Sequence, residues 1–382
     1  MNLQFTEEQQ MVLETVRGFA EKEVKRVASK MDAASEFPHA LIKALGEMGL
    51  MGAFIPTEYG GSGMDLLTYI LAMEEISKAW ASLGVIMTVN NSLACDPINR
   101  FGTQAQKERY LVPLAQGRLL GCYALTEPGA GSDAGGIATQ ARRDGNDYVL
   151  NGTKLFITNG KNADVAIVYA VTDPARGKKG ISAFIVEKAF SGFVVGKVED
   201  KMGLRGSDTA ELIFQECRVP SENLLGVENE GFKIALATLD GGRIGIAAQA
   251  LGIAQGCLEE SIAYAKERKQ FNRPIGDFQA IQNMLADMKT EIDAARLLTH
   301  RAAWSRHQGR PVTAIAAEAK LYASEMANRV AYKAVQIFGG YGFIKDFPVE
   351  RFYRDARITT LYEGTSEVQR MVIARQLLQP TS

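Results

Sequence analysis

Glu363 is the residue whose neighbours most clearly favour acid–base chemistry. It follows the apolar and β-branched run Ile358–Leu361, and it precedes Gly364 and a hydroxyl residue, Thr365, that can cap a following helix. A carboxylate packed among apolar groups has a raised pKa, because burial disfavours its charged form. Such a group can remove a weakly acidic proton from carbon near neutral pH. Most acidic residues lie in solvent, and that remains the alternative for this one.

A glycine-rich segment, Tyr123–Gly136, can bring the backbone close to a flat, polar ligand. Gly131 removes a side chain that would block approach, and Thr126 and Ser132 offer hydroxyl donors. Its GxGxxxG spacing does not indicate a dinucleotide-binding loop, since it lies mid-chain and Ile137–Ala141 continues as another β-like segment instead of a helix. An ordinary turn between strands is the alternative interpretation.

Phe156 and Thr158 lie two residues apart in a strand-like segment, which predicts that both side chains share one face. The pair suits an aromatic ring packed against an isoalloxazine while a hydroxyl reaches a ring nitrogen. A core phenylalanine beside a surface threonine is the commoner case for an isolated pair.

Two further segments could bind phosphate. Arg268, Lys269 and Arg273 place three cations in six residues, enough to hold a pyrophosphate, and the alternative is a solvated loop. The segment Gln336–Phe343 contains the double glycine Gly339-Gly340, which can end a helix and turn backbone N–H groups towards an anion; a simple helix cap is the alternative.

Composition excludes several other classes of function. The 382-residue chain has 43 Lys and Arg against 44 Asp and Glu, so no excess of charge points to nucleic acid or a membrane surface. Its three histidines form no HExxH motif, and no GxSxG motif occurs, so neither a metal site nor a serine hydrolase is expected. The four cysteines are far apart in sequence, which favours free, mostly buried thiols.

Three compositional zones predict an α+β multidomain fold. Residues 1–120 have helical patterning that begins at a capping box of Thr6 and Gln9. Residues 121–228 alternate short β-rich segments with turn residues, which predicts a middle antiparallel β-barrel-like domain. Residues 229–382 are alanine-rich and helical, with stretches near 231–267, 277–307, 311–339 and 365–378 that suit a C-terminal four-helix bundle.

These motifs together resemble the acyl-CoA dehydrogenase family. ALTEPGAGSDAGG at Ala124–Gly136 looks like the first signature of that family, and QIFGGYGFIKDFPVERFYRD at Gln336–Asp355 looks like its second. LYEGTSE at Leu361–Glu367 resembles the catalytic segment of the short- and medium-chain members. The resemblance covers essentially the whole chain, including IPTEYGGSG at Ile55–Gly63, and is greatest to short-chain, butyryl-CoA-type bacterial members.

The resemblance implies a cofactor, an assembly and a set of binding residues. The family binds FAD and forms homotetramers, dimers of dimers, in which two subunits contact each FAD; Gln336–Gly340 would come from a neighbouring subunit. The residues implied in FAD binding are Tyr123, Leu125, Thr126, Gly131, Ser132, Phe156, Ile157, Thr158, Arg268, Phe271, Gln279, Gln336, Ile337, Gly339, Gly340, Thr365, Ser366 and Glu367. Those implied in substrate binding are Ser132, Asp240, Arg243, Tyr362 and Gly364.

The resemblance also implies a reaction, in which Glu363 removes the α-proton of a short acyl-CoA. The β-hydride passes to flavin N5, the product is the trans-2-enoyl-CoA, and the Glu363 N–H and a flavin ribityl hydroxyl bind the thioester oxygen. Other family members carry the base at the position of Gly242, in the segment Asp240–Arg243, and glycine cannot serve as one. Many relatives have tryptophan where this chain has Phe156, which keeps the aromatic packing but loses the indole donor.

Several alternatives stay open at this point. The same fold could run as an enoyl-CoA reductase, act on a cyclic, branched or aryl acyl-CoA, or serve as an acyl-CoA oxidase. A protein that kept the fold and lost catalysis is a different class, and the intact Glu363 argues against it. The resemblance implies an electron-transfer flavoprotein as electron acceptor. We expect a bacterial cytoplasmic protein, or a mature mitochondrial matrix protein if the source is eukaryotic, with no membrane span.

Overall fold

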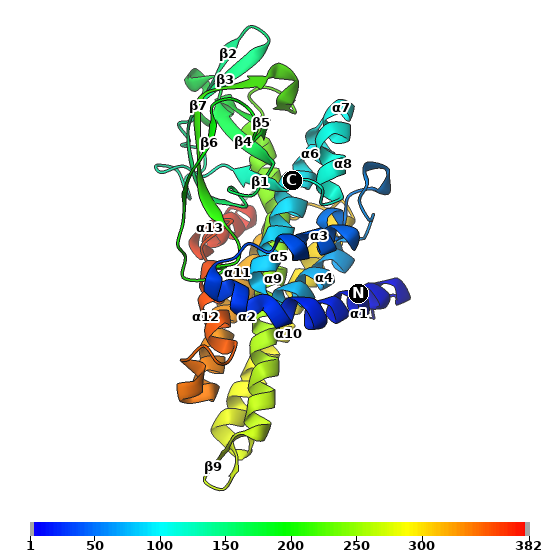
Figure 1. Ribbon diagram of the computed structural model, residues 1–382, viewed down its shortest axis with the longest axis vertical. Coiled ribbons are helices and arrows are strands. Elements are labelled where there is room, and N and C mark those ends of the chain that lie inside the picture. The colour runs from blue at the N-terminus through cyan, green and yellow to red at the C-terminus, as the bar shows by residue number, and fades with distance from the viewer. Residues whose placement is uncertain (1–3, 379–382) are drawn as a thin grey trace.

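The computed structural model describes residues 4–378, in which the N-terminal and C-terminal helices pack against each other and the sheet lies towards one end of the molecule (Figure 1). The N-terminal region begins at α1, where Thr6 Oγ1 accepts the Gln9 N–H at 3.2 Å and Gln9 Oε1 accepts the Thr6 N–H at 3.0 Å, so the predicted capping box is confirmed. Its helices are α1 Glu7–Phe19, α2 Lys25–Ala34, α3 His39–Glu47, α4 Leu66–Ala79, α5 Ala81–Thr88, α6 Asp96–Phe101, α7 Gln104–Gln106 and α8 Val112–Ala115.

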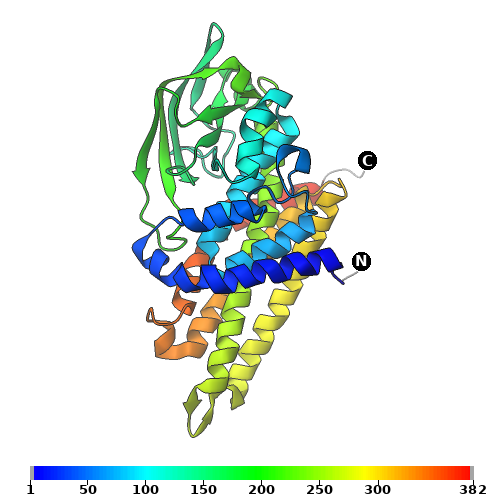
Figure 2. The same ribbon diagram turned by 45° about the vertical axis from the view of Figure 1, so that its right-hand side comes forward.

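Helices α4 and α5 lie in the core, while α1 and α2 cross the bundle on its outside (Figure 2). A π-helical segment, Val89–Cys95, joins α5 to α6, and every residue from Ala81 to Cys95 is buried. Because such a segment has no polar face, it has no helical alternation in its sequence. The structure agrees with the helical character expected of residues 1–120, but the separate limits of these helices could not be predicted.

The middle region is one eight-stranded sheet with the order β6-β7-β3-β2-β4-β5-β8, and β1 pairs with β4. Its strands are β1 Gly121–Ala124, β2 Gln140–Asp144, β3 Asp147–Thr158, β4 Val165–Val171, β5 Ile181–Glu187, β6 Phe193–Val198, β7 Thr209–Pro220 and β8 Leu224–Leu225. Most pairs are antiparallel as predicted, but β1 runs parallel to β4 and a single parallel bridge joins Gln140 to Val171. The chain passes through the β2–β3 hairpin between β1 and β4, and β4 then runs in the same direction as β1. The local sequence patterns could not predict this parallel pairing.

The C-terminal region is built on α9, a helix of 37 residues that is about 55 Å long at 1.5 Å per residue. It packs against α4, α10 and α11. The elements are α9 Gly231–Glu267, β9 Lys269–Gln270, β10 Arg273–Pro274, α10 Gln279–His307, α11 Thr313–Phe338, α12 Val349–Ile358 and α13 Ser366–Leu377. The order of helical, sheet and helical regions confirms the predicted fold class, although α12 was not identified from the sequence. All four cysteines are free and buried, as expected.

Candidate active site

Glu363 lies in the turn between α12 and α13, in a backbone conformation that few side chains adopt. Its φ is +51° and that of Gly364 is +91°, so two consecutive residues have left-handed φ values. Gln369, which is fully buried, donates from Nε2 to the carbonyl oxygens of Glu363 at 3.1 Å and Gly364 at 2.8 Å. The side chain of a residue on α13 therefore holds the turn that precedes that helix.

One oxygen of the Glu363 carboxylate is shielded from water. Oε2 is buried and has no hydrogen-bond partner among the described residues. Burial raises the pKa of Glu363 to about 7, while the positive charges of Lys320 and Arg243 oppose the rise. A carboxylate that titrates near neutrality can exist as a base and then hold a proton at physiological pH.

The surface facing this carboxylate is made by a glycine of α9. A Cβ at Gly242 would lie 2.0 Å from Glu363 Oε2 and 2.9 Å from Leu93 Cδ2, closer than atoms can approach. One turn further along α9, a Cβ at Gly245 would lie 2.2 Å from Thr88 Oγ1, which accepts the Tyr69 hydroxyl at 3.1 Å. The position implied as the alternative seat of a base is thus in direct contact with Glu363.

Three implied substrate-binding residues surround this point. Arg243 is 5% exposed, donates from Nη1 to Asp240 Oδ1 at 2.7 Å, and has a buried Nε without a partner in residues 4–378. Asp240 Oδ2 accepts the Thr313 hydroxyl at 2.7 Å. Tyr362 donates its hydroxyl to Gln249 Oε1. Burial raises the pKa of Glu363 against the charge of Arg243, and the charge of Glu363 adds to the rise that burial causes in the pKa of Tyr362, so both residues lie within the electrostatic range of Glu363.

The segment after β1 forms a wall next to the carboxylate. Burial raises the pKa of Tyr123 well above its usual value, and the neighbouring Tyr169 and the charge of Glu363 add to the rise, so Tyr123 lies within the electrostatic range of Glu363. Leu125 is buried and Thr126 is partly buried, while Gly131 and Ser132 are exposed. A Cβ at Gly131 would meet no atom of the chain, so the space in front of this loop is open to a ligand.

Strand β3 continues that wall, because the Leu155 N–H donates to Thr126 O at 2.9 Å. Phe156 has φ +58° at a β-bulge and is 62% exposed. Ile157 is buried and Thr158 is partly buried. The bulge means that a regular strand alternation does not describe this segment, yet it leaves an aromatic ring uncovered where a flat ligand would pack.

A buried ion pair that the sequence analysis missed supports the same wall. Lys154 Nζ donates to Glu127 Oε1 at 2.7 Å and to Leu125 O at 3.1 Å. Burial lowers the pKa of Lys154 to about 8, against the effect of Glu127. Burial would raise the pKa of Glu127, but Lys154 and the N–H groups of residues 138 and 139 outweigh it and lower that pKa. Lys154 and Glu127 are 27 residues apart in a chain with many charged residues, so the sequence contains no local signal of this pair.

Thr365, Ser366 and Glu367 lie at the start of α13, two to four residues after Glu363. Thr365 Oγ1 accepts the Val368 N–H at 3.3 Å, which confirms the predicted cap. Ser366 is buried, with Oγ unpartnered among the described atoms, and Glu367 is exposed.

The remaining implied cofactor residues gather at the other end of α9. Arg268, Ile337, Gly339 and Gly340 line one pocket, together with Tyr341, over whose ring the Arg268 guanidinium lies at 5.3 Å. Other members of this group are largely open to solvent: Phe271, at 87% exposed, Gln279 and Gln336. The 26 residues from Gly242 to Arg268 span about 39 Å of helix. This cluster does not join Glu363 within one chain, as the place of β9 far from the sheet shows (Figure 1).

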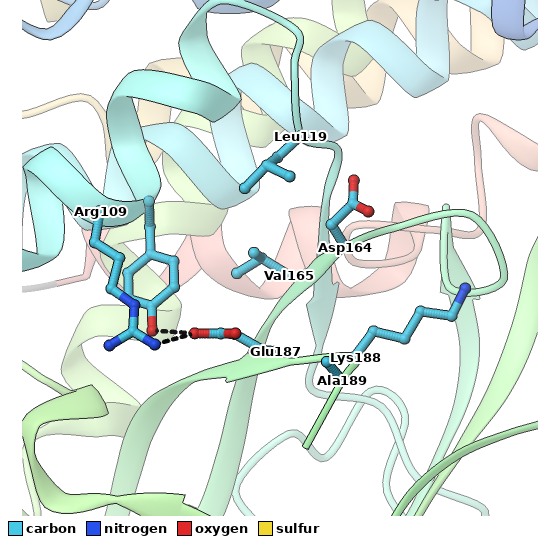
Figure 3. Close-up of a pocket in the computed structure, with 8 residues that line it drawn as sticks. Arg109, Leu119, Asp164, Val165, Glu187, Lys188 and Ala189 are labelled. Atoms are coloured by element: carbon cyan, nitrogen blue, oxygen red, sulfur yellow. Dashed lines mark hydrogen bonds and ion pairs between the residues drawn. The ribbon is translucent and has the colours of Figure 1, made fainter. Parts of the chain in front are cut away.

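A separate surface pocket lies where the N-terminal region meets β4 and β5 (Figure 3). Glu187 Oε1 accepts the Tyr110 hydroxyl and Arg109 Nη2, each at 2.7 Å. Asp164 Oδ2 accepts the Leu120 N–H at 2.9 Å. The carboxylates of this pocket are thus bound to groups of the chain itself, unlike that of Glu363.

Two further observations limit the chemistry of residues 4–378. No group of three or more His, Cys, Asp or Glu side chains in that range is arranged to hold a metal ion. Within the same range, no helix combines the length and the apolar character needed to cross a membrane.

Comparison with known proteins gives matches along the whole chain. The acyl-CoA dehydrogenase N-terminal, middle and C-terminal domain families match residues 6–118, 122–217 and 229–378. The short-chain specific acyl-CoA dehydrogenase of Clostridium acetobutylicum is 52% identical, over 99% of this chain and all of that protein.

Solved structures agree in fold over the same length. Butyryl-CoA dehydrogenase from Megasphaera elsdenii has a TM-score of 0.98 at 49% identity and covers 99% of this chain and all of its own. A chain from the structural work on the electron transferring flavoprotein of Acidaminococcus fermentans has a TM-score of 0.98 at 52% identity, with the same coverage. PigA, solved with FAD and proline, has a TM-score of 0.95 at 31% identity and covers 99% of each chain.

Proposed function

Because the chain belongs to the acyl-CoA dehydrogenase family, we propose that it converts a short acyl-CoA to the trans-2-enoyl-CoA with Glu363 as the base. The family makes it an FAD-dependent oxidoreductase. The observation that carries the role of Glu363 is its carboxylate atom Oε2, which is buried, unpartnered among the described residues and in contact with α9 at Gly242.

The residues of the chain would act in three ways. Glu363 takes the α-proton of the acyl-CoA onto its carboxylate, and its pKa near 7 lets it hold that proton. The Glu363 N–H would bind the thioester oxygen, which stabilises the charge that develops there. Asp240, Arg243, Ser132, Tyr362 and Gly364 would place the acyl-CoA against the base. When bound, FAD supplies the acceptor for the hydride that leaves the β-carbon.

The described residues fit a flavin beside Glu363. The exposed ring of Phe156, the partly buried hydroxyl groups of Thr126 and Thr158, and the open space before Gly131 form one wall. We therefore assign the isoalloxazine-binding residues to Tyr123, Leu125, Thr126, Gly131, Ser132, Phe156, Ile157 and Thr158, with Thr365, Ser366 and Glu367 at the start of α13.

The second cluster supports a homo-oligomer. An FAD whose ring faces Glu363 cannot reach Arg268 of the same chain along about 39 Å of α9. We propose that Arg268, Phe271, Gln279, Gln336, Ile337, Gly339 and Gly340 bind the pyrophosphate and adenosine of an FAD seated in another subunit. Arg268 and Gly339 line one pocket of one chain, so both would come from the same neighbour, in contrast to the division implied by the resemblance. A homotetramer, built as a dimer of dimers, meets this requirement.

We further propose an electron-transfer flavoprotein as the electron acceptor, which the similarity to the Acidaminococcus fermentans chain supports. The proposed compartment is the bacterial cytoplasm or, in a eukaryote, the mitochondrial matrix. The proposed domain limits are 1–120, 121–228 and 229–382, and the three matched families support them.

Anaerobic titration of the FAD-loaded protein with a panel of acyl-CoAs tests the function. A short straight-chain acyl-CoA should bleach the flavin fastest, whereas preference for a branched, cyclic or aryl acyl-CoA would replace the proposed substrate. Glu363→Gln should keep its yellow FAD and bleach at least 100-fold more slowly, the typical range for loss of a general base. Near-normal bleaching of that variant would refute the assignment of the base.

A further inference from the structure

We propose that Lys320 is the positioning residue of Glu363: its ammonium group holds the Glu363–Gly364 turn from α11 and places a positive charge opposite the carboxylate. This inference rests on the proposed role of Glu363 as the base. Helix α11 lies beside α12 and α13, so Lys320 reaches the turn from a third element (Figure 1).

The contact is made at the strained point of the backbone. Lys320 Nζ donates to Gly364 O at 2.7 Å, and Gln369 Nε2 donates to the same oxygen at 2.8 Å. Two donors from two helices thus fix the carbonyl group of Gly364, the residue that directly follows Glu363. A left-handed φ at a non-glycine residue is costly by itself and persists where surrounding contacts determine it. The direction of the Glu363 side chain depends on that φ.

Burial makes the charge of Lys320 significant. The residue is 0% exposed, and an ammonium group removed from water is stable only with a counter-charge or several acceptors. Burial lowers the pKa of Lys320 to about 8, and Glu363 is the largest influence that opposes it. The other charges that act on Lys320 are those of Arg243, which opposes its protonation, and Glu367 and Glu325, which favour it.

The charge of Lys320 also opposes the rise that burial causes in the pKa of Glu363. Lys320 is the largest influence that keeps the pKa of Glu363 from rising further, ahead of Arg243. Burial raises the pKa values of Tyr362, Tyr123 and Tyr69, and the charge of Glu363 adds to each rise, so all three hydroxyl groups are neutral near pH 7. Removal of the Lys320 charge should therefore raise the pKa of Glu363, so that less of the ionised base is present at neutral pH.

The test separates proton transfer from redox chemistry. A short acyl-CoA with sulfur in place of the β-methylene keeps its acidic α-protons and has no β-hydride to lose. In D₂O, Glu363 would break an α-carbon–hydrogen bond, take the proton, exchange it with solvent and return a deuteron to the enolate. NMR of the analogue, bound to the FAD-loaded enzyme, measures this exchange as a function of pD.

Lys320→Met should slow the exchange about 10- to 100-fold, as expected for a misplaced base, and move its acidic midpoint to higher pD. Lys320→Gln retains a donor for Gly364 O without the charge, so it should shift the midpoint with a smaller loss of rate. The control is Lys333→Met on the same helix, where the lysine pairs with Asp287 and Glu291 at a distance from the turn; it should change neither quantity.

The outcomes distinguish the two proposals. Normal exchange by Glu363→Gln would refute the base itself. Slow exchange by that variant, with wild-type rate and midpoint in both Lys320 variants, would refute only the positioning role. Failure of both Lys320 variants to yield folded, FAD-loaded protein would assign Lys320 to the fold and also overturn the inference.

Discussion

The parts of α9 near Gly242 and near Arg268 differ in how closely the rest of the chain packs against them. Near Gly242 the chain meets itself: the Glu363 carboxylate occupies the space that a Cβ would need, and Arg243 is almost fully buried. Near Arg268 the chain is open, since a Cβ at Gly339 or Gly340 would meet no atom within 4 Å.

The exposed surface follows the same contrast. Phe271 and Phe343 are each 87% exposed at the open end, an unusual position for large aromatic side chains. The part of α9 near Gly242, called the closed end here, is therefore completed by folding of one chain. The part near Arg268, the open end, presents a surface that a ligand and a second subunit would cover. Substitutions at the two ends should fail in different ways.

The largest expected effect is at the closed end. Gly242→Ala would force the new methyl group against Glu363 Oε2, so the carboxylate must move. We expect kcat to fall about 100-fold, the usual consequence of an ångström-scale displacement of a reacting group, while FAD stays bound. Gly18→Ala, at a helical glycine with open space around it, is the matched control and should leave kcat unchanged. Unaltered turnover of Gly242→Ala would mean that the carboxylate does not depend on this contact.

The next effect is at the open end. Arg268→Ala should weaken FAD binding about tenfold or more, because a charge-assisted contact to the pyrophosphate is lost. The acidic midpoint of the pH–rate profile, measured with saturating FAD, should stay in place because Glu363 is far away. Fluorescence of released FAD after dilution measures the affinity. Arg301→Ala, which removes an arginine paired with Glu318 on the bundle surface, is the control. Equal FAD affinity in both variants would contradict a pyrophosphate role for Arg268.

The sequence could predict features that depend on neighbouring residues, but not contacts between distant parts of the chain. The chemistry of Glu363 could be inferred from its neighbours in the chain, because the apolar run before it and the cap after it are local. The resemblance implied position 242 as the alternative seat of the base, but the contact between Gly242 and Glu363 was not predicted. Lys320 and Gln369 were missed, since a lysine 44 residues from its acceptor gives no local signal of that contact.

The fold follows the same rule. The limits of α9 agree with the predicted 231–267. Residues 1–120 were expected to be helical, but the limits of the helices from Ala81 to Phe101 were not predicted, because burial of nearly all of these residues removes the alternation on which such limits depend. The parallel pairing of β1 with β4 depends on the route of the chain between them, which strand patterns do not contain.

The smallest expected effect is one of stability, and it should appear only at the closed end. The pKa of Glu363 is about 7 in the folded chain against 4.5 for the ordinary side chain, so the folded state binds more protons between those values. Stability must then fall as pH rises through that window, by on the order of 1–3 kcal/mol for this group. Glu363→Gln removes the penalty, so its melting temperature relative to wild type should rise between pH 5 and pH 8, in calorimetry of the FAD-loaded proteins. Arg268→Ala should show no such change with pH. A constant difference between Glu363→Gln and wild type across that range would show that the carboxylate is hydrated and that the closed end is open to water.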